Sequence, residues 1–545
     1  MVAINVKNSE VDVILQRYAE ARTDKSRTDN ERREAGKFVW PAAQQQVMNA
    51  QSRDEQFRTL EKYDDTAVRG AYRMTSGIFT YLMPANTHWH GFKAQRYELN
   101  QQPEYQKWLS IAANQTHAEL MRSNFEREMF LTIRSMIVFG TGVISVEMID
   151  DDIIFKSHHI GYMFFSANSR GEIDTVYRQI FYDARQALQE FGEENCNKCP
   201  SIRKALKAKK LTDKFEFVHV CAPNRDFDKT KVGSKKVGSV YISIADKVMF
   251  RKPGDSGFEH LPYLVARFAR TPGGIMGYGP AMEYIDDIRM LNRMARSYIE
   301  AAEIANNPPM MAEDDGVIGQ PVTGPRGMIY IRSGAQFPQP YVSGINVQAN
   351  GEVLREMREI ILRIFFNDLF ESMGDHRNMS ATEAAIREKE LLVIATPAVV
   401  SLANEIFSPM LTRVLDLLLK SKKDNRIPQP PGDFDYDVVY QGRLALAMSN
   451  VQANAQEVVL AKYAPYAEVT PIFENVDMDK VIRHAWISGG APAENLTDYD
   501  QMIAARAERK QLEDAAAAAQ IGESASKAYK NVSGVPDEGS LASAL

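Results

Sequence analysis

The strongest constraint on the fold comes from one long amphipathic segment, residues 280–305. Pro280 suits the first position of a helix, and a helix of this length would run roughly 39 Å at 1.5 Å per residue. Its charged residues share one face by their spacing of three and four, and an apolar stripe flanks that face on each side. A helix that is apolar on both flanks needs two neighbours, which favours a ring of helices over a lone surface helix. The charged face is Asp286, Arg289, Arg293, Arg296, Glu300 and Glu303; one stripe is Ile285, Ile288, Ala295, Ile299 and Ala302, and the other is Tyr284, Leu291, Met294, Tyr298 and Ala301.

Composition narrows the class of protein further. The chain has 545 residues and a net charge of −6, so it is long enough for several domains and lacks the excess of basic residues that phosphate binding needs. The longest apolar run, residues 391–400, is too short for a membrane span and contains Pro397. The first ten residues lack the apolar core of a signal peptide. Three cysteines favour a reducing compartment over a disulfide framework, so we expect synthesis in the cytoplasm.

The hydrophobic pattern predicts an α+β fold that is mainly helical. Residues 1–135 are expected to be largely helical, with a break at Met83-Pro84. Between residues 143 and 250 the pattern approaches a period of two, which is typical of strands. The expected strands are residues 143–148, 175–181, 214–220 and 239–244, with a helix at residues 184–191.

A second long helix is expected after a Gly- and Pro-rich segment, at residues 352–370. A polar break, residues 371–378, then precedes a helix start at Ser380, where Glu383 completes a capping box. That helix is expected to continue to about residue 419, with bends at Pro397 and Pro409. A strand at residues 437–440, helices at 448–463 and 498–520, and a disordered Ser-, Gly- and Ala-rich tail from residue 522 complete the prediction.

Motifs of common enzyme classes are absent from the sequence. There is no Gly-x4-Gly-Lys-Ser/Thr phosphate loop and no Gly-x-Ser-x-Gly nucleophile elbow. The glycines before Pro280 lack dinucleotide-binding spacing, and a flexible joint before the helix is the favoured interpretation. Neither an enzymatic activity nor a cofactor is predicted. These glycines are Gly273, Gly274, Gly277 and Gly279.

Three groups of residues could hold a metal, and each has an ordinary alternative. Cys196-x-x-Cys199 with His219 and Cys221 could bind zinc, but the second pair is too close for usual finger spacing, so reduced thiols are favoured. His88 and His90 flank Trp89 and are expected to be exposed or packed beside it. Asp433, Asp435 and Asp437 alternate along a strand and could hold Mg²⁺ for a nuclease, but a solvated strand face is favoured.

Several segments, taken in order, resemble the head-to-tail connector (portal) family of short-tailed bacteriophages. The resemblance covers about residues 40–419, and the segment after Asp433 matches more loosely. The N-terminal motifs are Leu82-Met-Pro84 followed by Trp89, Phe139-Gly-Thr-Gly-Val143, Gly171-Glu-Ile-Asp-Thr-Val-Tyr-Arg178 and Leu261-Pro-Tyr-Leu-Val-Ala-Arg267. The later motifs are Tyr278-Gly-Pro280, Leu291-Asn292, Asp368-Leu-Phe370 and Met379-Ser-Ala-Thr-Glu383, with Glu388, Glu390 and Pro409 beyond them.

The resemblance implies a portal-type fold that assembles as a ring of twelve around an axial channel. It implies a wing at residues 1–278, a first stem helix at 279–305, a clip at 306–345 and a second stem helix at 346–370. A tunnel loop at 371–379, a long wing helix with a return strand at 380–447, a crown at 448–521 and a tail at 522–545 would follow. In the clip, Pro325 and Arg326 are expected at the surface that meets the packaging motor and the tail.

The implied function is structural: DNA would pass through the channel during packaging and ejection, without sequence specificity. The implied partners are the major capsid protein, a scaffolding protein, the terminase motor and a tail adaptor, and the implied location is the virion vertex that joins the tail. The alternatives are a Mg²⁺-dependent nuclease that uses Asp433, Asp435 and Asp437, and a soluble scaffold protein. The tunnel loop would line the channel, although spacing alone also fits an exposed interhelix turn; its residues are Glu371, Ser372, Met373, Gly374, Asp375, His376, Arg377 and Asn378.

Overall fold

The fold was analysed in a computed structural model of the chain, which divides into two compact units, Met1–Leu444 and Ala445–Leu545. The structure describes residues 10–43, 62–84, 88–96, 98–227, 235–253, 257–306, 308, 310–311, 317–318, 330–331, 333–334, 339–340, 347–367, 400–421, 427–432, 435–440, 478–479, 481–483 and 499–533.

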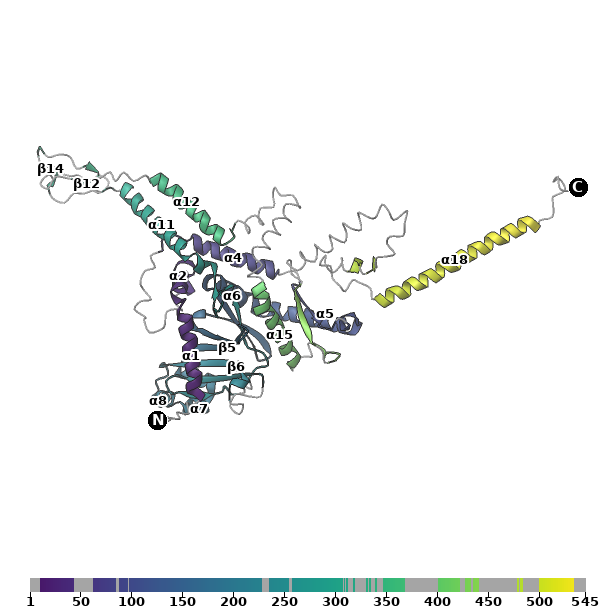
Figure 1. The fold of residues 1–545 in the computed structure, drawn as a ribbon, viewed down its shortest axis with the longest axis horizontal. Helices are drawn as coiled ribbons and strands as arrows, with labels where there is room; N and C mark the ends of the chain where they lie inside the picture. Colours follow the sequence, from purple (N-terminus) through teal and green to yellow (C-terminus); the bar gives the residue numbers. More distant parts are fainter. Residues whose placement is uncertain are drawn as a thin grey trace. The chain divides into compact units, whose positions relative to one another are not determined.

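A five-stranded antiparallel sheet forms one part of the first unit. Its strand order is β4-β5-β6-β7-β8, and its three longest strands confirm the strands predicted at residues 175–181, 214–220 and 239–244. Helix α1 (Glu10–Ser26) packs on one face through Ile14 and Tyr18, and helices α7 (Ala184–Lys198) and α8 (Pro200–Lys207) pack on the other (Figure 1). The strands are β4 (Met163–Ala167), β5 (Ile173–Asp183), β6 (Lys214–Pro223), β7 (Val237–Ser243) and β8 (Val248–Phe250).

A second, three-stranded sheet lies in the main hydrophobic core. Its order is β3-β2-β9, from β2 (Thr141–Ile149), β3 (Asp152–His158) and β9 (Tyr263–Arg267). The largely buried helix α6 (Phe125–Phe139) packs against it. Every strand pair in the described part of the chain is antiparallel, so the predicted α+β class, without an alternating parallel sheet, is confirmed.

Further helices surround this core, as predicted for the N-terminal region. They are α2 (Asp29–Val39), α4 (Thr66–Leu82) and α5 (Pro103–Arg122), and α4 ends just before the predicted break at Met83-Pro84. Helix α15 (Ser408–Lys420) follows a π-helical turn, Ala403–Phe407, close to the bend expected at Pro409. The predicted strand at residues 437–440 is β16 (Tyr436–Tyr440), and it pairs with β1 (His90–Ala94), a strand that the pattern did not predict.

The predicted pair of long helices is present in the first unit. The first is α11 (Ile285–Asn306), preceded by the short helix α10 (Pro280–Glu283) with a break at Tyr284. The second is α12 (Val347–Ile364), which packs beside α11 (Figure 1). Short antiparallel pairs occur between them: β12 (Met310–Met311) with β15 (Gln339–Pro340), and β13 (Val317–Ile318) with β14 (Tyr330–Ile331).

The end of α12 corrects a prediction. The helix was expected to reach residue 370 but ends at Ile364, and Phe366 adopts a left-handed conformation with φ 54°. The aromatic ring of Phe365 is buried against Gly70 of α4, which has no side chain to fill that space. Packing against α4 therefore ends the helix earlier than the pattern indicates.

In the part of the second unit that the structure describes, the long helix is α18 (Tyr499–Ser533). It confirms the helix predicted at residues 498–520. The helix continues to Ser533. The prediction that the chain is disordered from residue 522 is therefore wrong for residues 522–533. The alanine- and lysine-containing sequence after Gly522 has adequate helix propensity, and a helix accepts a single interior glycine at about 1 kcal/mol.

Candidate channel helices and the junction at their base

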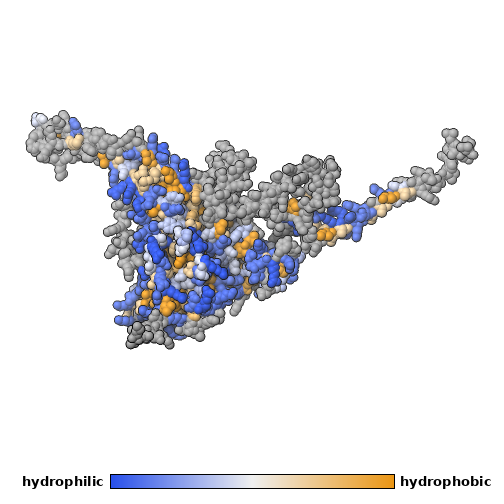
Figure 2. Space-filling view, in the orientation of Figure 1, coloured by the Kyte–Doolittle hydropathy of each residue, from blue (hydrophilic) through white to orange (hydrophobic). Residues whose placement is uncertain are grey.

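Helix α11 buries one composite face rather than one of the two predicted stripes. The buried residues come from both stripes, because Ile285, Ile288 and Ala295 belong to the first and Leu291 and Ala301 to the second. The apolar side chains of Tyr284, Met290, Ile299 and Ile304 remain exposed in the described part of the chain. Figure 2 shows hydrophobic residues among the hydrophilic surface of this helical pair. The predicted excess of apolar surface on α11 is therefore present.

The charged face of α11 is exposed except at Arg289, which is half-buried. Arg289 pairs with Glu34 of α2 and with Asp286, at 3.0 Å. Arg296 pairs with Glu300 at 2.7 Å. Within the described part of the chain, Arg293 and Glu303 have no ion-pair partner.

The second long helix, α12, is held against the rest of the first unit by a charged contact and a row of apolar side chains. Arg358 Nε donates a hydrogen bond to Asp64 at 2.8 Å, and Leu354 and Ile361 are buried. A second apolar row, led by the exposed Val353 and Ile360, faces away from the core. The two rows have helical spacing, so α12 also carries more apolar surface than one copy of the chain covers.

Two motifs of the predicted resemblance meet at the base of α11. Gly140 ends α6 in a left-handed conformation, and a Cβ there would overlap with the carbonyl oxygen of Gly277. The Gly277 N–H donates to Thr141 Oγ1 at 3.0 Å, and a side chain at Gly279 would overlap with the backbone of α6. The interpretation of Gly277 and Gly279 as a flexible joint is therefore wrong: both permit close backbone packing.

Two other motifs meet at Arg267, which is 4% exposed. Its backbone N–H and its guanidinium both donate to the Glu405 carboxylate, at 2.8 Å from the backbone nitrogen and 3.0 Å from Nε. The same guanidinium donates to the carbonyl oxygen of Gly171 at 3.3 Å. Glu405 lies on the π-helical turn and also accepts from Ser401 at 3.1 Å. This buried network joins the two sheets to the helix before α15, and sequence reasoning missed it.

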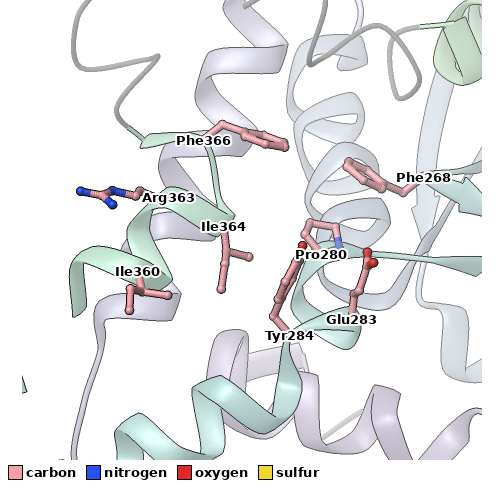
Figure 3. Close-up of a pocket in the computed structure, with 8 residues that line it drawn as sticks. All are labelled: Phe268, Pro280, Glu283, Tyr284, Ile360, Arg363, Ile364 and Phe366. Atoms are coloured by element: carbon pink, nitrogen blue, oxygen red, sulfur yellow. The ribbon is translucent and has the colours of Figure 1, made fainter. Parts of the chain in front are cut away.

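A groove of about 440 Å³ lies where α10, the start of α11 and the end of α12 meet. Figure 3 shows Ile364 pointing from α12 toward Tyr284, whereas Arg363 points away from them. The groove is mostly apolar, with Glu283 on its α10 side. Its apolar lining consists of Phe268, Pro280, Tyr284, Ile360, Ile364 and Phe366.

The cysteine cluster is not arranged as a zinc site. Cys196 and Cys199 are buried in the core under α7 and α8, whereas Cys221 belongs to the main core. Burial raises the pKa of the Cys199 thiol to about 11, which favours the neutral thiol. Both ring nitrogens of His219 bond to hydroxyls, of Tyr263 at 2.7 Å and Ser239 at 3.0 Å. In the regions that the structure describes, no group of three His, Cys, Asp or Glu residues is placed to hold a metal ion.

The histidines beside Trp89 differ in their surroundings. His88 is exposed, while Trp89 and His90 are buried. His90 lies 5.6 Å from the ring of His117, and burial lowers the pKa of His90 to about 3, with a smaller effect from His117 and His88. The expected packing beside the tryptophan is confirmed for His90, whose ring centroid is 4.6 Å from that of Trp89.

Of the proposed nuclease carboxylates, the structure describes Asp435 and Asp437. Asp435 and Asp437 are exposed beside and on β16, and Asp437 accepts a hydrogen bond from Gln95 at 3.0 Å. Lys93 lies opposite Asp437 in the register of β1 and β16. A solvated strand face therefore fits these two residues, and the nuclease alternative is not favoured. Asp433, the tunnel-loop residues 371–378, and Pro325 and Arg326 of the clip lie outside the described residues.

The chain was compared with known proteins. Residues 11–496 match the family described as bacteriophage head to tail connecting protein. A probable portal protein of Bordetella phage BPP-1 is 24% identical to this chain, over 87% of this chain and 86% of the phage protein. A portal protein of Salmonella phage epsilon15 is 22% identical over 96% of each chain. Among the helices that the structure describes, none is long and apolar enough to cross a membrane. The family match spans most of the sequence, and the chain therefore belongs to the bacteriophage head to tail connecting protein family.

Proposed function

We propose that the chain is the portal subunit of a short-tailed bacteriophage, twelve copies of which form a closed ring around a DNA channel. The observation that carries this proposal is the family match over residues 11–496, together with the α11–α12 pair and its uncovered apolar side chains. Exposed apolar surface on paired helices favours contact with further helices. The two similar proteins are named as portal proteins, which supports the same role here.

In this proposal the parts of the chain have separate tasks. The body of the first unit forms the wing, α11 and α12 form the stem, and the segment between them forms a clip that meets the terminase motor and later the tail adaptor. The second unit would form the crown. The ring would occupy the virion vertex that joins the tail, in contact with the major capsid and scaffolding proteins, after synthesis in the host cytoplasm.

Electron microscopy of negatively stained protein tests the ring directly. Purified full-length protein should give closed rings with a central opening, and light scattering should give a mass near twelve subunits. A stable monomer at micromolar concentration, both alone and after co-expression with the scaffolding protein, would contradict the proposal. The nuclease alternative is tested in the same preparation, by DNA cleavage with Mg²⁺ that Asp435→Ala abolishes.

The proposed tunnel loop, residues 371–378, is a separate part of the function. Each loop would repeat around the channel, so weak contacts with phosphates would add up without a basic patch. We expect deletion of residues 372–377 to leave rings and capsids intact and to give particles that lose packaged DNA. Normal DNA content and infectivity would instead indicate an ordinary interhelix turn.

A further inference from the structure

One edge of α12 carries four charged side chains with helical spacing. Their spacing of four, three and four places them on one face, and all four are exposed. Among the described residues the three carboxylates have no ion-pair partner. We call this set the α12 edge: Glu352, Glu356, Glu359 and Arg363.

One edge of α11 carries four charged side chains, one acidic residue followed by three basic residues. Their spacing of three, four and three also places them on one face. Arg289 and Arg296 have partners in the same copy, whereas Arg293 has none within the described part of the chain. We call this set the α11 edge: Asp286, Arg289, Arg293 and Arg296.

The two edges are complementary when one is read against the other in the opposite direction. The α11 edge runs from one acidic residue to three basic residues, and the α12 edge, from Arg363 backwards, runs from one basic residue to three acidic residues. We propose that the α11 edge of one copy of the chain packs against the α12 edge of the next copy. This inference rests on the proposed ring and names the surfaces that close it.

Contacts within one copy set the register of this interface. Gly351 of α12 lies beside Tyr298 of α11, because a Cβ on Gly351 would be 3.5 Å from the Tyr298 ring. Five residues separate Gly351 from Glu356, and five separate Tyr298 from Arg293 in the opposite direction. Both helices rise about 1.5 Å per residue, so the same count of five from this contact brings Arg293 and Glu356 to about the same height along the pair, to within the length of the tyrosine side chain.

We take the axis of the proposed ring to run along the helical pair, and rotation about such an axis does not change that height. Arg293 of one copy would then lie level with Glu356 of the next. The same count, to within one residue, pairs Asp286 with Arg363, Arg289 with Glu359, and Arg296 with Glu352. All four pairs join opposite charges.

These pairs do not form inside one copy. There α11 and α12 meet through other sides, with Leu291, Ala295, Leu354 and Ile361 buried, and Arg363 points away from α11 (Figure 3). Two different edges that bind each other form a head-to-tail contact, which closes into a ring when the rotation permits. Each exposed pair is weak because solvent screens it, so its main effect is to select the neighbour and the register.

Charge reversal tests this pairing in the full-length chain. We expect Arg293→Glu and Glu356→Arg each to raise the protein concentration needed for half-assembly by roughly tenfold or more, because like charges then meet at every interface. The double variant restores opposite charges and should assemble within about twofold of the unchanged protein. Arg203→Glu, on the exposed surface of α8, is the matched control and should assemble normally. Sedimentation velocity measures all four.

The outcomes separate this inference from the proposed function. If the unchanged protein forms rings and the single reversals assemble like the control, the interface is wrong while the ring stands. Failure of the double variant to recover also overturns the pairing. If the unchanged protein never forms rings, the proposed function fails and this inference with it.

Disulfide cross-linking gives a second measurement. A chain with both Arg293→Cys and Glu356→Cys should form disulfides between copies on oxidation, because the proposed contact places these two positions opposite each other. The native cysteines, Cys196, Cys199 and Cys221, are buried and should not interfere. Denaturing gels without reductant should show a ladder that stops at the number of subunits in the ring. Rings that give only monomer bands after oxidation would overturn the proposed contact.

Discussion

Gly140 and Gly273 have nearly the same φ angle but opposite surroundings. Their φ angles are +77° and +76°, in the region that costs an L-residue roughly 1–2 kcal/mol. A Cβ on Gly140 would overlap with the backbone of Gly277, while nothing lies within 4 Å of a Cβ on Gly273. The comparison therefore separates backbone strain from packing.

We expect Gly273→Ala to lower the free energy of unfolding by about 1 kcal/mol. Gly140→Ala should lower it by about 3 kcal/mol or more, because the added methyl group also forces the junction at the base of α11 apart. Urea midpoints of the two variants provide the measurement. Equal losses would show that the close approach of Gly140 and Gly277 contributes nothing.

The buried side chain of His90 should make the stability of the chain depend on pH. Its pKa is about 3 in the folded chain, mainly because of burial, and about 6.5 when unfolded. Between these values the unfolded chain binds more protons, so stability rises with pH across this window and falls on acidification, by about 1.4 kcal/mol per pH unit for this group. We expect His90→Gln to reduce the slope of unfolding free energy between pH 4 and 6. The exposed His88→Gln is the control, and an unchanged slope in His90→Gln would refute the assignment.

At the scale of elements, propensity and packing decide different helix ends. The sequence pattern of α12 continues past Ile364, but packing of Phe365 against Gly70 stops the helix there. In α18 the opposite holds, because the side chains described along this helix are nearly all exposed and Gly522 has open space around it. Local propensity therefore has more influence on α18 than on α12.

Gly522→Ala tests that contrast. Alanine is favoured over glycine in a helix interior by about 1 kcal/mol, so amide exchange in α18 on both sides of residue 522 should slow by about fivefold. Gly522→Pro should abolish protection in the turn before it. Hydrogen exchange of the full-length chain measures both. No change in Gly522→Ala would mean that contacts other than local propensity hold this helix.

At the scale of the whole molecule, assembly and docking should depend on different segments. The proposed interface uses the edges of α11 and α12, whereas the proposed clip lies between these helices in sequence. Loops with proline, glycine and scattered charge suit a surface that exchanges partners. Changes in the clip should therefore leave the ring intact.

The double change Pro325→Ala with Arg326→Ala addresses this point. We expect rings of normal mass and a severe loss of DNA packaging or tail attachment, measured as particles that are empty or tailless by electron microscopy. Arg293→Glu is the opposite control, since it should weaken ring assembly itself. Loss of rings in the clip variant would instead identify the clip as a clamp between subunits.

The sequence alone determined the types of most elements and the family. Strands β5, β6 and β7 and helix α11 follow from their periodicity, and the start of α10 follows from Pro280, because these signals act between residues a few positions apart. The charged residues of α11 were likewise placed on one face by spacing alone. The resemblance required only the order of short motifs, and the family match confirms it.

Tertiary structure decided the contacts between distant segments. Arg267 and Glu405 are separated by 138 positions, and no local sequence pattern predicts that this buried arginine forms an ion pair with that carboxylate. The five-residue strand β1 was missed because its partner, β16, lies far along the chain. The role of Gly277 was mispredicted for the same reason. A side chain at this position would overlap with the backbone of Gly140, which lies far away in the sequence. Periodicity reports which face of an element is buried, but only the folded chain determines which surface buries it.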